Sequence, residues 1–165
     1  MQSVIIPGSI TFTGEAEAEP VTLSEAKAYL RVGYDSEDAY ITALITAARQ
    51  WVESHTAVSV ITRTVSCTVE LYGSIELPYG PVRGTIAPVD GVLFTKGPFP
   101  RVYGACGYYD ITYQAGYETP PEGLRQAILA RVAAMFENRG DQDKTNYSQV
   151  AKEHYLPFKR ISQWL

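Results

Sequence analysis

The sequence is poor in the residues that most often form metal sites and disulfide frameworks. Its 165 residues include two cysteines and two histidines. Cys67 and Cys106 have no second cysteine at metal-ligand spacing, so we interpret both as small apolar side chains in a reducing compartment. Neither a zinc site nor a disulfide framework is expected.

The two histidines do not suggest a catalytic base. His55 falls at the end of the apolar stripe of a predicted helix, and His154 lies in the basic C-terminal region. A nucleophilic enzyme needs a base beside a serine or cysteine, and no such combination is evident. We therefore predict that the protein is not an enzyme.

Carboxylates and glycines also give no cofactor motif. Asp35, Glu37 and Asp38 lack the glycine and the distal glutamate of a calcium loop, and acids are common in the first turn of a helix. Residues 104–107 (GACG) lack the Lys-Ser/Thr pair of a phosphate-binding loop, so we interpret them as a loop between strands. We expect no metal and no cofactor.

Long apolar runs and excess positive charge are missing as well. No run approaches the roughly 20 apolar residues of a membrane-spanning helix, which argues against a membrane protein. The first seven residues have no cation before their apolar run, so no secretory signal is expected and synthesis in the cytoplasm is the default. The net charge of −4 has the wrong sign for a protein that coats nucleic acid over its whole surface.

Helical patterns occupy both ends of the chain. A capping box at Thr22 and Glu25 predicts a short helix over 23–31 that stops at Gly33. A longer helix is predicted after Ser36, and further helices over about 121–139 and 147–155. The apolar positions of the second helix are Ile41, Leu44, Ile45, Ala48, Trp51, Val52 and His55, and those of the third are Leu124, Ile128, Val132, Met135 and Phe136.

The middle of the chain has strand character. β-branched and aromatic residues gather in short runs separated by glycine and proline, with strand candidates within 58–71 and at 75–77, 91–95 and 109–113. We predict a small antiparallel sheet or a set of hairpins.

These segments together predict an α+β fold. It is a small antiparallel bundle of about three main helices and a short C-terminal helix, with a β-rich insertion between the second and third main helices. The expected single domain consists of an N-terminal arm or peripheral strand (1–18), a helical part (19–57), the β-rich insertion (58–118), a second helical part (119–155) and a C-terminal tail (156–165).

The order of several segments resembles the head-tail connector (adaptor) proteins of tailed phages. The N-terminal segments are 19–32 (EPVTLSEAKAYLRV), 38–41 (DAYI) and 44–53 (LITAARQWVE). The later segments are 75–78 (IELP), 109–117 (YDITYQAGY), 121–129 (PEGLRQAIL) and 136–139 (FENR). The resemblance covers roughly residues 19–160 and lies in the ordered set of segments.

This resemblance implies a structural virion protein without catalysis, located in the neck at the head-tail interface. Such a protein forms a twelve-subunit ring beneath the portal and joins the DNA-filled capsid to the stopper or tail. The implied partners are the portal protein, a stopper or tail-completion protein, further copies of the chain, and genomic DNA that passes through the lumen without sequence-specific binding. No membrane is implied.

The C-terminal tail is the predicted portal contact. It combines large apolar groups with cations, the composition that dominates interface energetics. The candidate residues are Phe158, Lys159, Arg160, Ile161, Trp164 and Leu165. The alternative for this segment is a closing strap packed on its own subunit, which limited proteolysis would distinguish from an arm.

Two other functions stay open at this point. The chain has the features of a stopper or tail-completion protein of the same particle, which would need the adaptor ring beneath it. Its twelve tyrosines, many of them in the β-rich segment, also fit a soluble module that stacks sugars or bases.

Overall fold

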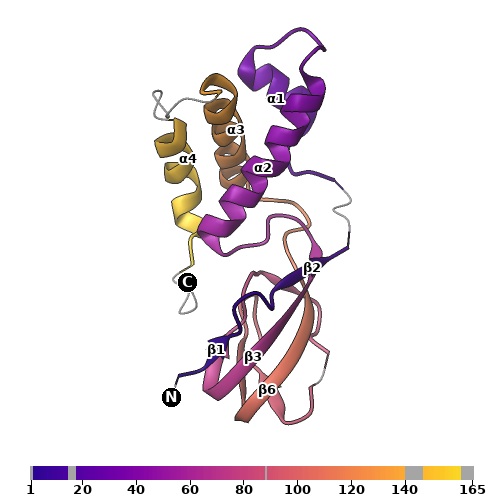
Figure 1. Ribbon diagram of the computed structural model, residues 1–165, viewed down its shortest axis with the longest axis vertical. Coiled ribbons are helices and arrows are strands. Elements are labelled where there is room, and N and C mark those ends of the chain that lie inside the picture. The colour runs from indigo at the N-terminus through magenta and orange to yellow at the C-terminus, as the bar shows by residue number, and fades with distance from the viewer. Residues whose placement is uncertain (1, 15–17, 88, 140–146, 161–165) are drawn as a thin grey trace. The chain divides into compact units, whose positions relative to one another are not determined.

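The computed structural model describes residues 2–14, 18–87, 89–139 and 147–160 (Figure 1). The chain divides into two compact units. The β unit contains Met1–Glu17, Ala57–Glu118 and Arg160–Leu165, and the helical unit contains Ala18–Thr56 and Thr119–Lys159. The fold is α+β, as predicted. None of the described helices is long and apolar enough to cross a membrane.

The helical unit begins with α1 (Leu23–Leu30), whose start is as predicted. The Glu25 amide donates to Thr22 Oγ1 at 3.2 Å, and the Thr22 amide donates to Glu25 Oε2 at 2.8 Å, which completes the capping box. The predicted left-handed stop at Gly33 is wrong. Arg31 takes the left-handed conformation instead, with φ 57° and ψ 37°. This conformation lets the Arg31 amide donate to the Ala28 carbonyl and the Val32 amide donate to the Lys27 carbonyl.

The long helix α2 (Asp38–Thr56) buries a stripe that differs from the predicted one at its end. Ile41 and Ala48 are buried as expected, but Trp51 is only half-buried and His55 is exposed. The buried face continues through Arg49, Glu53 and Thr56 instead. The spacing of apolar residues could not reveal that these three polar residues are buried, because their burial depends on hydrogen-bond partners inside the helical unit.

The helix α3 (Glu122–Glu137) is buried on more than one side, because α2 and α4 (Tyr147–Tyr155) both pack against it. Small residues such as Ala127 and Ala130 are fully buried there. Of the predicted apolar face, Leu124, Ile128 and Val132 are buried, while Met135 and Phe136 are partly exposed. A short 3₁₀ turn, η1 (Leu156–Phe158), follows α4.

The β unit is a six-stranded antiparallel sheet within the described residues. Its strand order is β1-β3-β6-β4, with β2 also paired to β3 and β5 also paired to β6. The N-terminal residues therefore form edge strands on the insertion. The strands are β1 (Val4–Ile5), β2 (Thr11–Thr13), β3 (Arg63–Glu76), β4 (Val82–Arg83), β5 (Val92–Phe94) and β6 (Arg101–Ala115).

Strands β3 and β6 are longer than the sequence predicted, because both continue through glycines. β3 passes Gly73, with φ 108°, at a bulge in its register with β6. β6 passes Gly104, where a Cβ atom would lie 2.9 Å from the Gly91 carbonyl oxygen. The predicted loop at 104–107 is therefore wrong, since these residues belong to β6.

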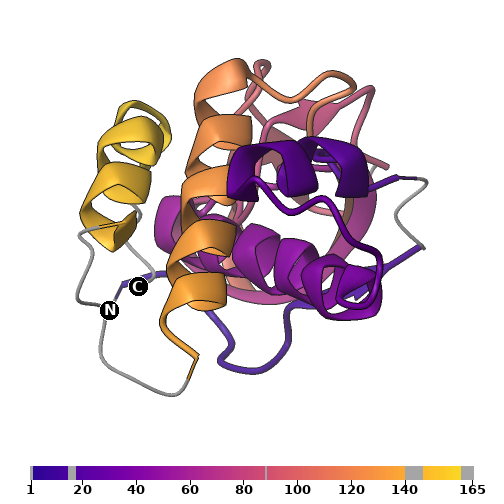
Figure 2. The ribbon, with the colours of Figure 1, turned by 90° about the horizontal axis from the view of Figure 1, so that it is seen from above.

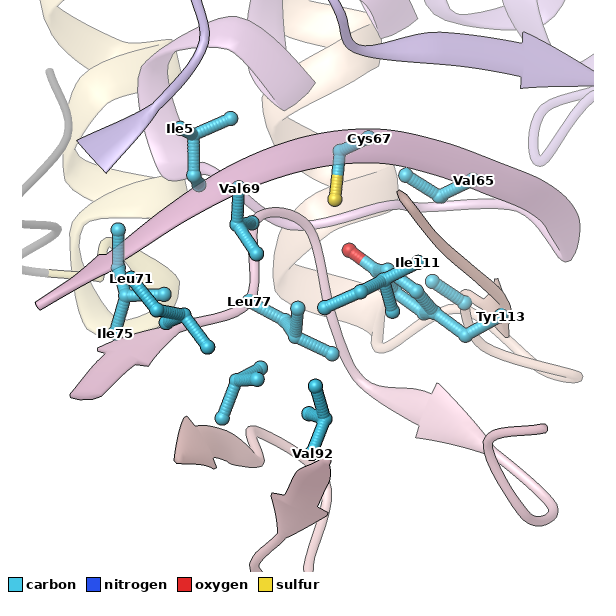
Figure 3. Packing of buried hydrophobic residues seen from close by; sticks show 12 residues of the cluster. Ile5, Val65, Cys67, Val69, Leu71, Ile75, Leu77, Val92, Ile111 and Tyr113 are labelled. Carbon is cyan, nitrogen blue, oxygen red and sulfur yellow. The ribbon is translucent and has the colours of Figure 1, made fainter. Parts of the chain in front are cut away.

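The core of the β unit lies on one face of this ladder, where the alternating residues of both strands meet (Figure 3). Cys67 pairs with Ile111, and Val65 pairs with Tyr113. The Tyr113 hydroxyl donates to the Pro78 carbonyl, and burial raises the pKa of this phenol well above its usual value. Cys67 is buried as expected, whereas Cys106 is exposed.

Candidate assembly surfaces

Three of the six predicted portal-binding residues lie within the described part of the chain. Phe158 is half-buried, Lys159 is exposed, and Arg160 has only 8% of its side chain exposed. The other three candidates, Ile161, Trp164 and Leu165, lie outside the described residues.

Arg160 is held by the β unit. One terminal nitrogen donates to the Ala57 carbonyl at 3.2 Å, and the other donates to the Leu77 carbonyl at 3.1 Å and to a Glu76 carboxylate oxygen. The guanidinium carbon also lies 4.3 Å from the centre of the Phe99 ring. This arginine is therefore already paired with a carboxylate of its own subunit.

Phe158 packs on the helical unit at the start of α3. A Cβ atom on Gly123 would lie 2.7 Å from the Phe158 ring, so glycine at this position makes room for it. Lys159, by contrast, has its side chain in solvent. Of the three described tail residues, Lys159 is the one whose charge is free to meet another protein.

A buried ion-pair network on α2 was not predicted from the sequence. Arg49 Nε donates to Glu19 Oε2 at 2.8 Å, and Arg49 Nη1 donates to Glu53 Oε2 at 3.0 Å. Burial lowers the pKa of Arg49, but the bonds and charges of the two carboxylates outweigh it and raise the pKa overall. The four-residue spacing of Arg49 and Glu53 was the available signal.

An aromatic cluster with one arginine lies where α2 begins and α3 ends. The Arg139 guanidinium lies 4.7 Å from the centre of the Tyr40 ring and 4.5 Å from that of Phe136. Arg139 Nη2 also lies 2.7 Å from Glu37 Oε1, and the Tyr34 hydroxyl donates to the same carboxylate at 3.2 Å. Tyr34 and Tyr40 keep much of their surface in solvent.

The predicted carboxylate group has partners that explain it without a metal. Lys27 Nζ lies 2.6 Å from Asp35 Oδ1 and 2.7 Å from Asp38 Oδ1, and Glu37 is bonded to Arg139. The hydrogen bond from Lys27 lowers the pKa of Asp35. Over the described ranges, no three His, Cys, Asp or Glu side chains are grouped so that they could hold a metal ion.

The two histidines are also accounted for. The His55 ring lies 4.2 Å from the Trp51 ring, and its Nδ1 lies 2.8 Å from the Trp51 carbonyl oxygen. His154 is exposed on α4. Ser54 Oγ lies 3.2 Å from His55 Nδ1, but the hydroxyl donates to the Trp51 carbonyl at 2.8 Å, and the same His55 nitrogen lies against that carbonyl. The histidine nitrogen is therefore engaged by the helix backbone and is not placed to act as a base on the serine.

Two tyrosines of the β unit, Tyr72 and Tyr108, lie with Glu70 on the outer side of the β3–β6 ladder. The Tyr72 hydroxyl donates to Glu70 Oε1 at 3.0 Å, and Tyr108, paired with Glu70 across the ladder, is 67% exposed. Hydrogen bonding to Glu70 and its negative charge raise the pKa values of both phenols. These tyrosines therefore stay neutral donors at physiological pH.

Comparison with known families bears on this chain directly. Residues 20–84, which run from the start of the helical unit into the β unit, match the phage gp6-like head-tail connector protein family. The resemblance to the head-tail connector family is confirmed. No curated protein matches the sequence.

Solved structures share this fold over nearly the whole chain. A chain in the neck of an empty gene transfer agent (GTA) particle, computed with C6 symmetry, is similar with a TM-score of 0.74 and 20% identity. A chain in the virion of a native GTA particle has a TM-score of 0.72, and one in the native neck computed with C12 symmetry has 0.67, both at 18% identity. Each comparison covers 92% of this chain and 95% of the other.

Proposed function

We propose that the protein is a structural virion component, a head-tail connector in the neck of a phage-like particle. The observation that carries this proposal is the shared fold over 92% of the chain with chains from GTA necks, together with the family match over residues 20–84. The protein has a mechanical role and no catalytic one. This fits the pairing of its described carboxylates and the packing of His55 on Trp51.

In this role, copies of the chain form a twelve-subunit ring beneath the portal and hold the stopper or tail below it. The related necks were computed with sixfold and twelvefold symmetry, which supports a ring. The four described helices act as a small antiparallel bundle that packs on neighbouring copies, since closed rings need repeated subunit contacts.

DNA passes through such a ring without being held. Residues 64–74 of β3 and 103–114 of β6 contain two acids, Glu70 and Asp110, and no base. Arg63 and Arg101 lie at the ends of these two strands, and the stretch between them lacks the groups that neutralise phosphates, so it would let a duplex slide. The outer face of the β3–β6 ladder therefore suits a channel wall.

The C-terminal tail remains the proposed portal contact, with different tasks for its residues. Lys159 is exposed and available for a carboxylate of the portal, whereas Arg160 is occupied by Glu76 of its own subunit. Arg160 thus anchors the tail on the β unit, and the residues around it make the contact with the portal.

Sedimentation of the protein alone and mixed with portal rings of the same particle tests the function. A complex with about a dozen copies per portal, in keeping with the twelvefold symmetry of a related neck, is the expected result. A protein that ignores the portal but binds a preformed adaptor ring would instead be a stopper. If it bound neither, quenching of its tyrosine fluorescence by small ligands would identify a ligand-binding module.

Two shortened or altered chains test the tail. Removal of residues 161–165 keeps the Arg160 contacts, while Lys159→Glu reverses the exposed charge. Both changes should weaken portal binding without changing the thermal unfolding temperature. Exposed Lys96→Glu on the β unit is the matched control and should bind normally. Unchanged binding by both tail variants would show that the tail is a strap on its own subunit.

A further inference from the structure

Residues 22–37, which contain α1 and the turn into α2, bury little apolar surface. We call them the α1 segment. All of them are described, and only Ala26 among them is buried. By contrast, α3 buries eight of its sixteen residues. Val21, just before the segment, and Ile41, on the first turn of α2, are 1% and 0% exposed. Apolar packing therefore fixes the chain on either side of the α1 segment but hardly within it.

Ion pairs join the α1 segment to the two helices that it packs against, α2 and α3 (Figures 1 and 2). One partner of each pair belongs to the segment, and the other lies at an end of α2 or α3. The pairs are Lys27 with Asp38 at 2.7 Å, Glu25 with Arg125, and Glu37 with Arg139 at 2.7 Å. The docking of α1 thus depends on charges at three places.

The charges in these pairs are partly open to water. In each pair at least one side chain is a third or more exposed, namely Asp38 at 34%, Glu25 at 41% and Arg139 at 46%. Ion pairs of this kind are individually weak and are screened by dissolved salt. Salt should therefore weaken the docking of α1 while it leaves the apolar packing of α3 in place.

Helix α1 is too short to be stable when it is not docked. It has eight residues, and isolated helices of fewer than about 12 residues are marginal in water. The capping box of Thr22 and Glu25 supports its first turn only. Loss of docking would therefore also open the α1 amides to exchange with solvent.

We propose that the α1 segment is an electrostatic latch, which detaches from α2 and α3 when its ion pairs are screened or broken, while α2 and α3 stay folded. Val21 and Ile41 are the fixed ends of the latch, because both stay in the core. The latch is a property of the folded subunit and exists whether or not the protein is a connector. It lets the contacts of α1 change without unfolding of the helical unit.

Hydrogen exchange of the whole chain at two salt concentrations tests the latch. Raising NaCl from about 0.1 M to about 1 M shortens the screening length from about 10 Å to about 3 Å. Amides of residues 24–31 should then exchange about fivefold faster, while amides of residues 126–134 in α3 keep their rates. Equal acceleration of both helices would indicate global unfolding, and no acceleration of α1 would show that apolar packing holds it. Either result would overturn the proposal.

Charge variants test the same latch at constant salt. Arg139→Glu places a carboxylate against Glu37, so α1 should exchange fast at low salt already and respond less to added salt. Adding Glu37→Arg restores an ion pair with reversed charges and should recover most of the protection. The matched control is Lys152→Glu at an exposed position of α4, which should exchange like the parent chain. Equal exchange in Arg139→Glu and Lys152→Glu, or no recovery in the double variant, would contradict the latch.

Thiol labelling shows whether α1 leaves its site. In a Cys106→Ser background, which removes the exposed native thiol, Ala26→Cys and Ala130→Cys are made separately. Both alanines are 0% exposed, the first in α1 and the second in α3. A thiol reagent should label the Ala26→Cys chain faster at high salt and the Ala130→Cys chain slowly at both concentrations. Identical rates for the two chains at both concentrations would show that α1 stays docked.

Discussion

The helical unit and the β unit differ in the polar groups that they bury. In the helical unit, the buried face of α2 includes a charged pair, Arg49 and Glu53. In the β unit, the core of the ladder is apolar apart from the Tyr113 hydroxyl, and glycines allow close backbone approaches. The difference shows that apolar periodicity detects a helix well but does not reveal which of its polar residues are buried.

Breaking the charged pair should give the largest effect. Arg49→Met leaves Glu53, only 3% exposed, without its guanidinium partner, so we expect a loss of about 3–5 kcal/mol of unfolding free energy. The double variant Arg49→Met with Glu53→Met should lose less, because the buried Glu53 carboxylate is then gone and the other partner, Glu19, has 25% of its side chain exposed to solvent. Urea denaturation of both variants measures this. Equal losses would show that the pair contributes through packing alone.

The second-largest loss of stability is expected when Gly116 of the β unit is replaced. Its φ is 125°, and a Cβ atom there would lie 2.0 Å from the Ile61 carbonyl oxygen. Gly116→Ala should therefore cost about 2–4 kcal/mol.

The matched control is Gly73, which has φ 108° but nothing within 4 Å of a Cβ atom. Gly73→Ala should cost only about 1 kcal/mol, from backbone strain alone. Thermal unfolding of the two variants compares them directly, and similar losses would refute the steric explanation.

Arg160 tests whether the anchor of the tail stabilises the β unit. Arg160→Ala removes hydrogen bonds to Glu76, Leu77 and Ala57 and should cost about 1.5–3 kcal/mol. Arg160→Lys should recover only part of this, since an ammonium cannot reproduce the planar fork. Hydrogen exchange at residues 76–80 reports the effect, and unchanged protection would argue against the anchor.

A smaller, pH-dependent effect is expected at the capping box. Hydrogen bonds from Thr22 and the charge of Arg125 lower the pKa of Glu25 below its usual value of 4.5. A lowered folded-state pKa contributes stability above the unfolded pKa, and this contribution is lost as the pH falls through the folded pKa. Glu25→Gln should reduce stability by no more than about 1 kcal/mol at pH 7 and weaken the acid dependence below pH 4.5. Unfolding curves from pH 3 to pH 7 measure the difference, and parallel curves would contradict it.

The smallest effect concerns thiol reactivity and leaves stability unchanged. Burial raises the pKa of Cys67 to about 12, so its thiolate is scarce at neutral pH, while Cys106 is exposed. A thiol reagent should label one cysteine quickly in the folded protein and two after denaturation. The fast label should disappear in Cys106→Ser.

Much of the helical unit was predictable because its signals are local. The capping box of Thr22 and Glu25 specifies where α1 begins, and the spacing of Ile41 and Ala48 identifies the buried side of α2. The burial of Arg49 was not predictable in the same way, because one of its partners, Glu19, lies thirty residues away in the sequence.

The candidate assembly surfaces, too, were predictable in part from the sequence and in part only from the structure. The sequence identified the tail by its composition and the family by its ordered segments, and it predicted the portal contact that remains to be tested. It did not indicate that Arg160 pairs with Glu76, which is 84 residues away, nor that α1 and α4 lie on opposite sides of α3.

The sequence by itself determined the helix starts, the α+β class and the connector resemblance, because caps, periodicity and segment order are properties of neighbouring residues. Only the tertiary structure decided the length of β3 and β6, the edge pairing of the N-terminal strands, and the partners of Arg49 and Arg160. These features depend on contacts between distant segments, where hydrogen bonding to a partner strand or a buried carboxylate overrides the local preference for a turn or for solvent.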